Sequence, residues 1–314
     1  MVESKHQWKA WLYLSPALVL LLIFTAWPIV NTLRMAFLEG YGNLSAAGGA
    51  TFSFGFGNFT KVLQYKHFID CLLNTLLLCV LTVPISTLLA LLIAVCLNAI
   101  KPLQRFLQTI FFLPYVTNSI AIGMVFAAMF NMIPGATPDV YDSVGIINNI
   151  IEFFGGEPIN WINQGSAQWA NVAVVTVYIV WNALPFKILV LLGGLQGVNK
   201  QYYEAAKIDG TPRVRVFTKI TVPLLSPMIA YVVITGFIGG FKEYTSIVGI
   251  FGEGMQPPGA GVGTPRLQTM VGYIYDALKT NSQGTASASA IILFLLIFAV
   301  TLVNLRVSKK NTHY

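Results

Sequence analysis

The sequence carries very little charge. Only 10% of its 314 residues are charged, 55% are hydrophobic, and the mean hydropathy is +0.69. Soluble domains have about a quarter of their residues charged, because their surfaces must be hydrated. The composition therefore excludes a soluble globular protein and predicts that most of the chain lies in lipid.

Cysteine and histidine are also scarce, with three of each. Cys71 and Cys79 fall in one apolar run, and on a helix they would be about 12 Å apart, which is too far for a disulfide. The histidines share no metal-ligand spacing. The sequence has no nucleophile–base pair, phosphate-binding glycine loop or dinucleotide fingerprint. We therefore expect no catalytic residue, metal or cofactor in this chain, which excludes an enzyme.

Long apolar runs are what the sequence does contain. A helix needs about 20 apolar residues to cross the hydrocarbon core, and lipid-exposed backbone must satisfy its own hydrogen bonds. The first run is too long for the core of a signal peptide. The predicted fold is all-α, a polytopic membrane protein with six transmembrane helices in one domain. The six runs are Trp11–Phe37, Cys71–Leu97, Phe106–Phe130, Trp169–Leu192, Leu224–Ile250 and Ala288–Val307.

The distribution of Lys and Arg predicts the orientation. With both termini in the cytoplasm, the inner segments hold 13 of the 19 basic residues, and the outer segments hold nine of the 12 acidic ones. Cytoplasmic loops carry such an excess of positive charge, so the net charge of +7 needs no nucleic-acid partner. The inner basic residues are Lys5, Lys9, Lys101, Arg105, Lys187, Lys200, Lys207, Arg213, Arg215, Lys219, Arg306, Lys309 and Lys310. The outer segments, including Asn131–Gln168, are expected to be loops.

One polar segment interrupts the apolar pattern between the fourth and fifth runs. Asn199–Ile208 has the pattern of a short helix, and Asp209–Pro212 is typical of a turn. Apolar spacing resumes before Pro223, so the segment is predicted to be a helix–turn–helix on the membrane surface. On pattern alone, a connector that only rests on lipid headgroups is the alternative.

The residues of this polar segment resemble a known family. Glu204-Ala205-Ala206, Gly210, Ile220 and Pro223 match the signature loop of inner-membrane permease subunits of binding-protein-dependent ABC importers. Landmarks elsewhere in the chain are similar to the sugar-permease branch of that family. They include Asn58-Phe59, Asn74-Thr75, Phe112-Leu113-Pro114, Gly145-Ile146-Ile147-Asn148, Leu184-Pro185-Phe186 and Gly194-Leu195-Gln196. The resemblance covers nearly the whole chain.

The resemblance implies a function and a set of partners. Residues 193–223 would form a cytoplasmic coupling loop, and Glu204, Ala205, Ala206, Asp209 and Gly210 would meet an ATP-binding subunit. The family implies a second permease subunit, two ATP-binding subunits and an extracytoplasmic solute-binding protein. The chain itself would bind no ATP. It would carry a solute, a saccharide by resemblance, across the bacterial cytoplasmic membrane. Lys242 departs from the family pattern, so the sequence does not define the sugar.

The fourth and fifth runs are candidates for the substrate path. Each run presents four residues on one face at helical spacing. The alternative is that small residues at this spacing pack helices together. Lys187 and Glu243 are intramembrane charges, which indicate a functional role by default. They could pair with each other or contact the substrate. Because a neutral sugar would not require Lys187, an acidic sugar or a sugar phosphate remains a possible substrate. The eight residues are Ile179, Ala183, Phe186, Lys187, Gly236, Gly239, Gly240 and Glu243.

A self-sufficient secondary transporter is the alternative function. Such a transporter places ionisable residues deep in its spans and is built from repeats with broken helices. The sequence has few such ionisable residues and no visible repeat or broken helix. A membrane enzyme would require a catalytic constellation, which the sequence does not contain.

Overall fold

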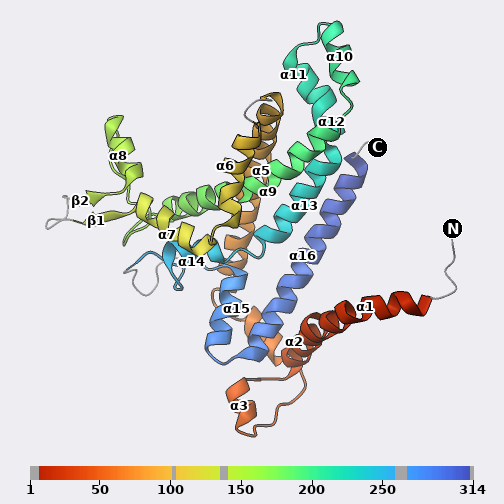
Figure 1. Ribbon diagram of the computed structural model, residues 1–314. Coiled ribbons are helices and arrows are strands. Elements are labelled where there is room, and N and C mark those ends of the chain that lie inside the picture. Colours follow the sequence, from red (N-terminus) through yellow and green to blue (C-terminus); the bar gives the residue numbers. More distant parts are fainter. Residues whose placement is uncertain (1–6, 101–103, 135–140, 259–266, 312–314) are drawn as a thin grey trace. The chain divides into compact units, whose positions relative to one another are not determined.

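The computed structural model describes residues 7–100, 104–134, 141–258 and 267–311 (Figure 1). Lys5 and Lys101 of the charge count lie outside the described residues. The chain divides into two compact units. The N-terminal unit comprises Met1–Phe68 and Tyr273–Leu295, and the main unit comprises Ile69–Gly272 and Leu296–Tyr314.

Among the described residues, four helical segments are long and apolar enough to cross a membrane. The first is continuous from α1 (Gln7–Leu21) through the π-helical η1 (Leu22–Ala26) to α2 (Trp27–Phe37). The others are α5 (Phe68–Ala99), α9 (Gln168–Gly197) and α16 (Gln283–Asn311). Two further pairs of helices also qualify if each bent pair is one span, which gives between four and six spans. The prediction of an all-helical membrane protein is confirmed.

The third predicted span is broken. It consists of α6 (Gln104–Val116) and α7 (Ser119–Phe130), which meet at an angle of 99°. The side chain of Asn118 accepts hydrogen bonds from the backbone N–H groups of Ile120 and Ala121, so α7 starts with its own N-cap. The expectation of one continuous helix over Phe106–Phe130 was therefore wrong.

The fifth predicted span is also broken, and it is shorter than expected. It is formed by α11 (Arg213–Val216), π-helical η2 (Phe217–Thr221), α12 (Val222–Leu224) and α13 (Ser226–Gly240), with a bend of 68° before α13. The helix ends at Gly240 instead of Ile250, and a separate helix α14 (Thr245–Phe251) follows. Broken helices, which the sequence did not reveal, are thus present.

The core of the main unit lies where α5, α7, α9, α13 and α14 pack together. One cluster of buried side chains includes Leu78, Tyr178 and Ile247, and a second includes Leu91 and Leu192. Glycine lets α7 and α14 cross closely: a Cβ atom on Gly123 would lie 2.7 Å from the Cα atom of Gly249. Close backbone approach at small residues is how membrane helices gain van der Waals contact.

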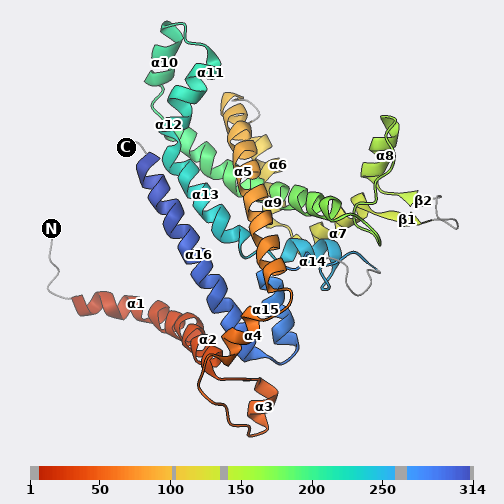
Figure 2. The ribbon, with the colours of Figure 1, turned by 180° about the vertical axis from the view of Figure 1, so that it is seen from behind.

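The segment between α7 and α9, predicted to be a loop, has its own structure. Strands β1 (Met132–Pro134) and β2 (Tyr141–Val144) form an antiparallel hairpin in which Met132 pairs with Val144. Helix α8 (Ile146–Phe153) follows and projects from the hairpin in both ribbon views (Figures 1 and 2).

The N-terminal unit holds the short helices α3 (Asn43–Ala47) and α4 (Gly57–Leu63) beside the first span. Fully buried Asn58 donates to the carbonyl oxygens of Ala36 and Leu38 and accepts from the N–H of Gly40. These hydrogen bonds hold the backbone of residues 36–40, where the first span ends and the following loop begins. Helix α15 (Met270–Lys279) begins in the main unit and ends in the N-terminal unit.

Candidate functional site

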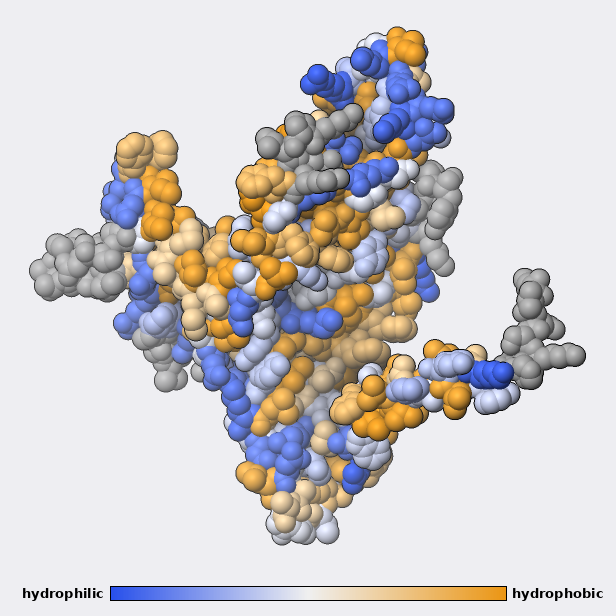
Figure 3. All heavy atoms as spheres, viewed as in Figure 1, coloured by the Kyte–Doolittle hydropathy of each residue, from blue (hydrophilic) through white to orange (hydrophobic). Residues whose placement is uncertain are grey.

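The predicted helix–turn–helix is present at one end of the main unit. Helix α10 (Gln201–Ile208) and helix α11 form a hairpin beyond α12 and α13 (Figures 1 and 2). The space-filling view shows hydrophilic residues gathered there, whereas hydrophobic residues dominate over the spans (Figure 3). The structure therefore presents a polar hairpin at the end of apolar helices, as the sequence predicted.

The turn of this hairpin depends on Gly210. Its φ is +65°, a left-handed conformation that side chains with a Cβ atom disfavour. The N–H of Thr211 donates to the carbonyl oxygen of Ala206 at 2.9 Å, and the N–H of Gly210 donates to that of Lys207 at 3.2 Å. These two bonds form a Schellman motif, which ends α10 by satisfying its last carbonyl groups. The prediction that Gly210 permits a special turn geometry is confirmed.

The predicted docking residues divide by exposure. Glu204, Ala205, Asp209 and Gly210 are exposed, but Ala206 is only 5% exposed. The side chain of Ala206 is therefore covered within this chain, whereas the other four residues are accessible.

Two apolar side chains on the hairpin were not among the predicted site residues. Ile208 is 86% exposed and Val214 is 75% exposed, on either side of the turn. Aliphatic side chains contribute hydrophobic free energy only when they are removed from water, so these two contribute none unless a partner covers them. The signal was present in the sequence, because both residues interrupt a run of charged and polar positions.

Lys187 is the clearest of the predicted path residues. It is 4% exposed and lies inside α9, ten residues before the end of the helix, so it does not belong among the cytoplasmic charges. Its Nζ atom donates to the carbonyl oxygen of Val83 at 3.2 Å, to Oγ of Ser86 at 2.7 Å and to Oγ1 of Thr87 at 2.9 Å, all on α5. Within the part of the chain that the structure describes, it forms no ion pair with Glu243 or any other carboxylate.

The hydrogen bonds around Nζ fit an ammonium group. The Ser86 hydroxyl donates to the carbonyl oxygen of Thr82, and the Thr87 hydroxyl donates to that of Val83. Their protons are thus used within α5, and both hydroxyl oxygens can only accept from Lys187. The three oxygen acceptors match the three N–H donors of an ammonium group. The site is a buried cation solvated by neutral oxygen atoms.

The three predicted path glycines do not share one environment. A Cβ atom on Gly236 would lie 3.2 Å from the Lys187 Nζ atom, and one on Gly240 would lie 2.8 Å from Sγ of Cys79. Gly239 is exposed and has open space around it. Gly236 and Gly240 therefore pack α13 against its neighbours, and only Gly239 faces free volume.

Glu243 has a local structural role. Its Oε1 atom accepts hydrogen bonds from the backbone N–H groups of Tyr244 and Ser246 at 3.2 and 3.1 Å, at the start of α14. Residues at this position satisfy N–H groups that have no partner within the helix. The side chain is only half-buried, so part of it remains accessible from outside the protein.

Phe186 belongs to an aromatic cluster that the sequence did not identify. Its ring lies 6.3 Å from that of Tyr115 on α6 and 6.4 Å from that of Tyr231 on α13, measured between centroids. Both tyrosines are about half exposed, at 54% and 49%. Ile179 is part of the buried core and Ala183 is half-buried. Three helices thus present a partly exposed aromatic surface at Phe186.

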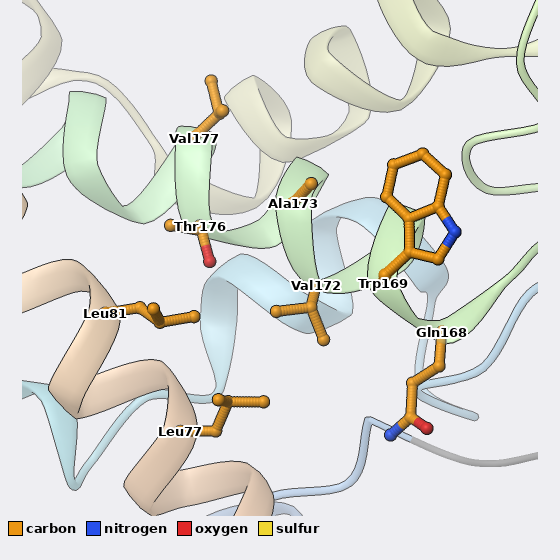
Figure 4. A pocket seen from close by; sticks show the side chains of 8 residues that line it. All are labelled: Leu77, Leu81, Gln168, Trp169, Val172, Ala173, Thr176 and Val177. Carbon is orange, nitrogen blue, oxygen red and sulfur yellow. The ribbon is translucent and has the colours of Figure 1, made fainter.

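The described residues also form two open grooves. One of about 650 Å³ lies between α5 and α9, where Leu77 and Leu81 face Val172 and Thr176 and the ring of Trp169 stands at one end (Figure 4). The other, of about 670 Å³, lies beside α10 and includes Gly194 and Tyr202. Neither groove is lined by any of the eight predicted path residues.

Comparison with protein families gives one match over most of the chain. Residues 86–313 match the family described as binding-protein-dependent transport system inner membrane component. This match contains α9, the α10–α11 hairpin and α13.

Individual relatives cover nearly the whole chain. The sulfoquinovosyl glycerol transport system permease protein SmoG of Agrobacterium fabrum is 30% identical over 320 residues, covering 98% of this chain and 96% of the relative. The lactose transport system permease protein LacF of Rhizobium radiobacter is 29% identical over 301 residues, with 94% and 91% covered. Among solved structures, a chain of a bacterial ABC transporter involved in the import of the acidic polysaccharide alginate has a TM-score of 0.77 at 21% identity, with 98% of both chains covered.

Proposed function

Since the chain belongs to the family of inner membrane components of binding-protein-dependent transport systems, we propose that it carries a saccharide across the membrane and couples this step to ATP hydrolysis by partner subunits. It is the non-catalytic permease subunit of an ABC importer and a multi-pass inner-membrane protein. The relatives named above and AraP of Bacillus subtilis, named for arabinooligosaccharides, support a saccharide as the solute. A secondary transporter is disfavoured because the family works with a binding protein.

The α10–α11 hairpin is the observation that supports coupling. It is polar, it stands at the end of apolar helices, and its turn is fixed by Gly210 in a conformation that few residues adopt. We propose that it docks on an ATP-binding subunit through Glu204, Ala205, Asp209 and Gly210. A rigid hairpin transmits closure of that subunit as a rigid-body movement of the helices to which it is joined.

Ile208 and Val214 act as the apolar anchors of this docking. Interfaces gain most of their free energy from a few buried side chains in pockets, with polar residues at the rim. The carboxylates of Glu204 and Asp209 fit the rim, where they meet basic groups of the partner. Ala206 supports the hairpin from within, because it is buried in the chain itself.

The assembly contains a second permease subunit, two ATP-binding subunits and an extracytoplasmic solute-binding protein. One solved relative is an alginate ABC transporter in complex with an alginate pentasaccharide-bound periplasmic protein, with a TM-score of 0.75. Both termini of this chain are proposed to be cytoplasmic. With Lys187 assigned to the membrane, twelve of the remaining basic residues still fall on the inner side by the count above.

The aromatic cluster at Phe186 is the proposed contact for the solute. Aromatic rings present an apolar face that suits the C–H groups of a sugar ring. Because the three rings lie on different helices, a movement of these helices would change the spacing of the rings around the solute. Ala183, Gly239 and Glu243 are also accessible in part and complete the path. Ile179, Lys187, Gly236 and Gly240 shape the path by packing.

The coupling role is tested with two valine substitutions in one loop. Gly210→Val forces a β-branched residue into a left-handed conformation, at a cost of about 1–2 kcal/mol or more, and should abolish solute-stimulated ATP hydrolysis by the assembled complex. Gly197→Val is the matched control, because Gly197 ends α9 without a positive φ and has open space around it. Stimulated hydrolysis at the parent rate in Gly210→Val would show that the hairpin does not couple the subunits.

A further inference from the structure

Helix α8 has an unusual distribution of apolar side chains. Ile146, Ile150, Phe153 and the C-cap residue Phe154 recur at positions i, i+4, i+7 and i+8, which places them on one face. This face is exposed: the two isoleucines are 59% and 49% exposed, and the two phenylalanines are 84% and 82% exposed. The hydropathy surface shows hydrophobic residues over α8 (Figure 3).

The opposite side of α8 is fixed by one buried asparagine. Asn148 is 1% exposed, donates to the carbonyl oxygen of Ile159 at 3.0 Å and accepts from the N–H of Ile159 at 3.1 Å. Its Oδ1 atom also accepts from Nε1 of Trp161 at 2.9 Å. These bonds attach α8 to the following segment through the side opposite its apolar face.

Trp161 connects α8 to the ends of two membrane-spanning segments. Its ring packs edge-on against Phe130, the last residue of α7, with centroids 5.6 Å apart. It packs in the same way against Trp169, the second residue of α9, at 5.8 Å. Tryptophan is enriched where spans leave the hydrocarbon, and Trp169 is itself 60% exposed. Trp161 therefore holds α8 beside the end of α7 and the start of α9.

We infer that α8 is an interfacial anchor, whose apolar face is buried at the boundary between lipid headgroups and acyl chains. Amphipathic helices lie in this plane with their apolar face about 5–10 Å deep. Lipid is favoured over a protein as the occupant because Trp161 and the 60% exposed Trp169 lie at the ends of α7 and α9, and tryptophan is typical of the boundary of the hydrocarbon. An anchored α8 keeps the ends of α7 and α9 together at the membrane surface while other helices move.

The inference is tested by the depth of a probe on α8. Cys71, Cys79 and Cys96 form no disulfide, and each would react with the label, so all three are first replaced by alanine. A new cysteine at Phe153, carrying an environment-sensitive fluorophore, is compared with one at Glu152, an exposed residue away from the apolar face. The assembled transporter is placed in phosphatidylcholine vesicles that contain either nitroxide-labelled lipid or aqueous iodide as quencher.

The expected result is opposite quenching at the two positions. The probe of Phe153→Cys should emit at shorter wavelength and be quenched by nitroxide lipid, whereas the probe of Glu152→Cys should be quenched by iodide. Equal iodide quenching at both positions would overturn the inference, and so would protection of Phe153→Cys from both quenchers, which would indicate a protein partner. Ile150→Cys lies on the same apolar face and repeats the measurement if Phe153→Cys does not assemble.

Discussion

The buried ammonium of Lys187 leads to a prediction about which substitutions destabilise the protein. In Thr87→Val, the hydroxyl that accepts from Nζ is replaced by a methyl group of the same shape, and Nζ keeps its charge. A hydrogen bond to a charged group contributes about 1.5–3 kcal/mol, and a charged donor left without its partner adds a desolvation cost. We therefore expect Thr87→Val to lower the free energy of unfolding by about 2–3 kcal/mol.

Lys187→Met should have a much smaller effect. It removes a cation that costs about 2.5–3.5 kcal/mol at the centre of a membrane helix, and it also removes three hydrogen bonds. The hydroxyls of Ser86 and Thr87 keep their bonds to carbonyl oxygens of α5, so no buried donor is left without a partner. Replacing a buried charge by an apolar side chain of similar volume is close to neutral when no buried polar group is left without a partner, so we expect a change within about 1 kcal/mol.

A double-mutant cycle separates the two effects. In the Lys187→Met background, Thr87→Val should cost less than about 0.5 kcal/mol, because no ammonium remains to be satisfied. Unfolding by SDS from mixed micelles measures the four free energies. Thr82→Val is the control, because Thr82 is equally buried on α5 but its hydroxyl donates to the carbonyl oxygen of Leu78 and does not contact Lys187.

Two outcomes would refute this reasoning. One is an equal cost of Thr87→Val with and without Lys187, and the other is a loss of more than about 3 kcal/mol in Lys187→Met. Uptake gives a second readout: if Lys187 packs and does not contact the solute, Lys187→Met transports with unchanged substrate preference. A changed preference would instead support the sequence-based hypothesis that Lys187 contacts an acidic sugar or a sugar phosphate.

Three further predictions concern packing, the solute path and topology. Gly240→Ala should lower the free energy of unfolding by about 1–3 kcal/mol, because its Cβ atom would lie 2.8 Å from Sγ of Cys79. Cys79→Ala should restore the stability of this variant, and Gly239→Ala should leave stability unchanged. If Cys79→Ala does not restore stability, the packing of Gly240 against Cys79 is contradicted. Phe186→Ala should slow solute uptake at unchanged basal ATP hydrolysis, whereas uptake at the parent rate would exclude the aromatic cluster from the path. With the native cysteines replaced, Gly156→Cys should react with a membrane-impermeant thiol reagent in intact cells and Lys310→Cys should not; the reverse pattern would overturn the orientation.

The sequence predicted the membrane helices well because their signal is additive over many residues. Each run of about 20 apolar residues must cross the bilayer as a helix, and this requirement does not depend on neighbouring spans. The turn at Gly210 was predictable for a related reason: its geometry is local, and a glycine after a short helix favours a left-handed C-terminus. The hairpin could thus be placed without any knowledge of the tertiary structure.

The broken spans were not predictable from hydropathy. Asn118 and Lys242–Tyr244 lie within or beside apolar runs whose average is hardly changed by them. Their effect depends on specific hydrogen bonds. The Asn118 side chain accepts from backbone N–H groups at the start of α7, and the Glu243 side chain accepts from those at the start of α14. Whether a polar residue caps a new helix or remains within an old one depends on which orphan groups it can reach, and that is decided by tertiary packing.

The substrate-path residues show why spacing alone could not assign a role to each position. Gly236, Gly239 and Gly240 satisfy the same helical spacing, but two of them are in contact with α5 or α9 and the third faces open space. Lys187 was expected to be functional because a membrane charge is costly. That cost is met here by a serine, a threonine and a carbonyl group on α5, about 100 residues earlier in the chain. An intramembrane charge therefore indicates a polar partner, and only the structure reveals whether this partner is a ligand or the protein itself.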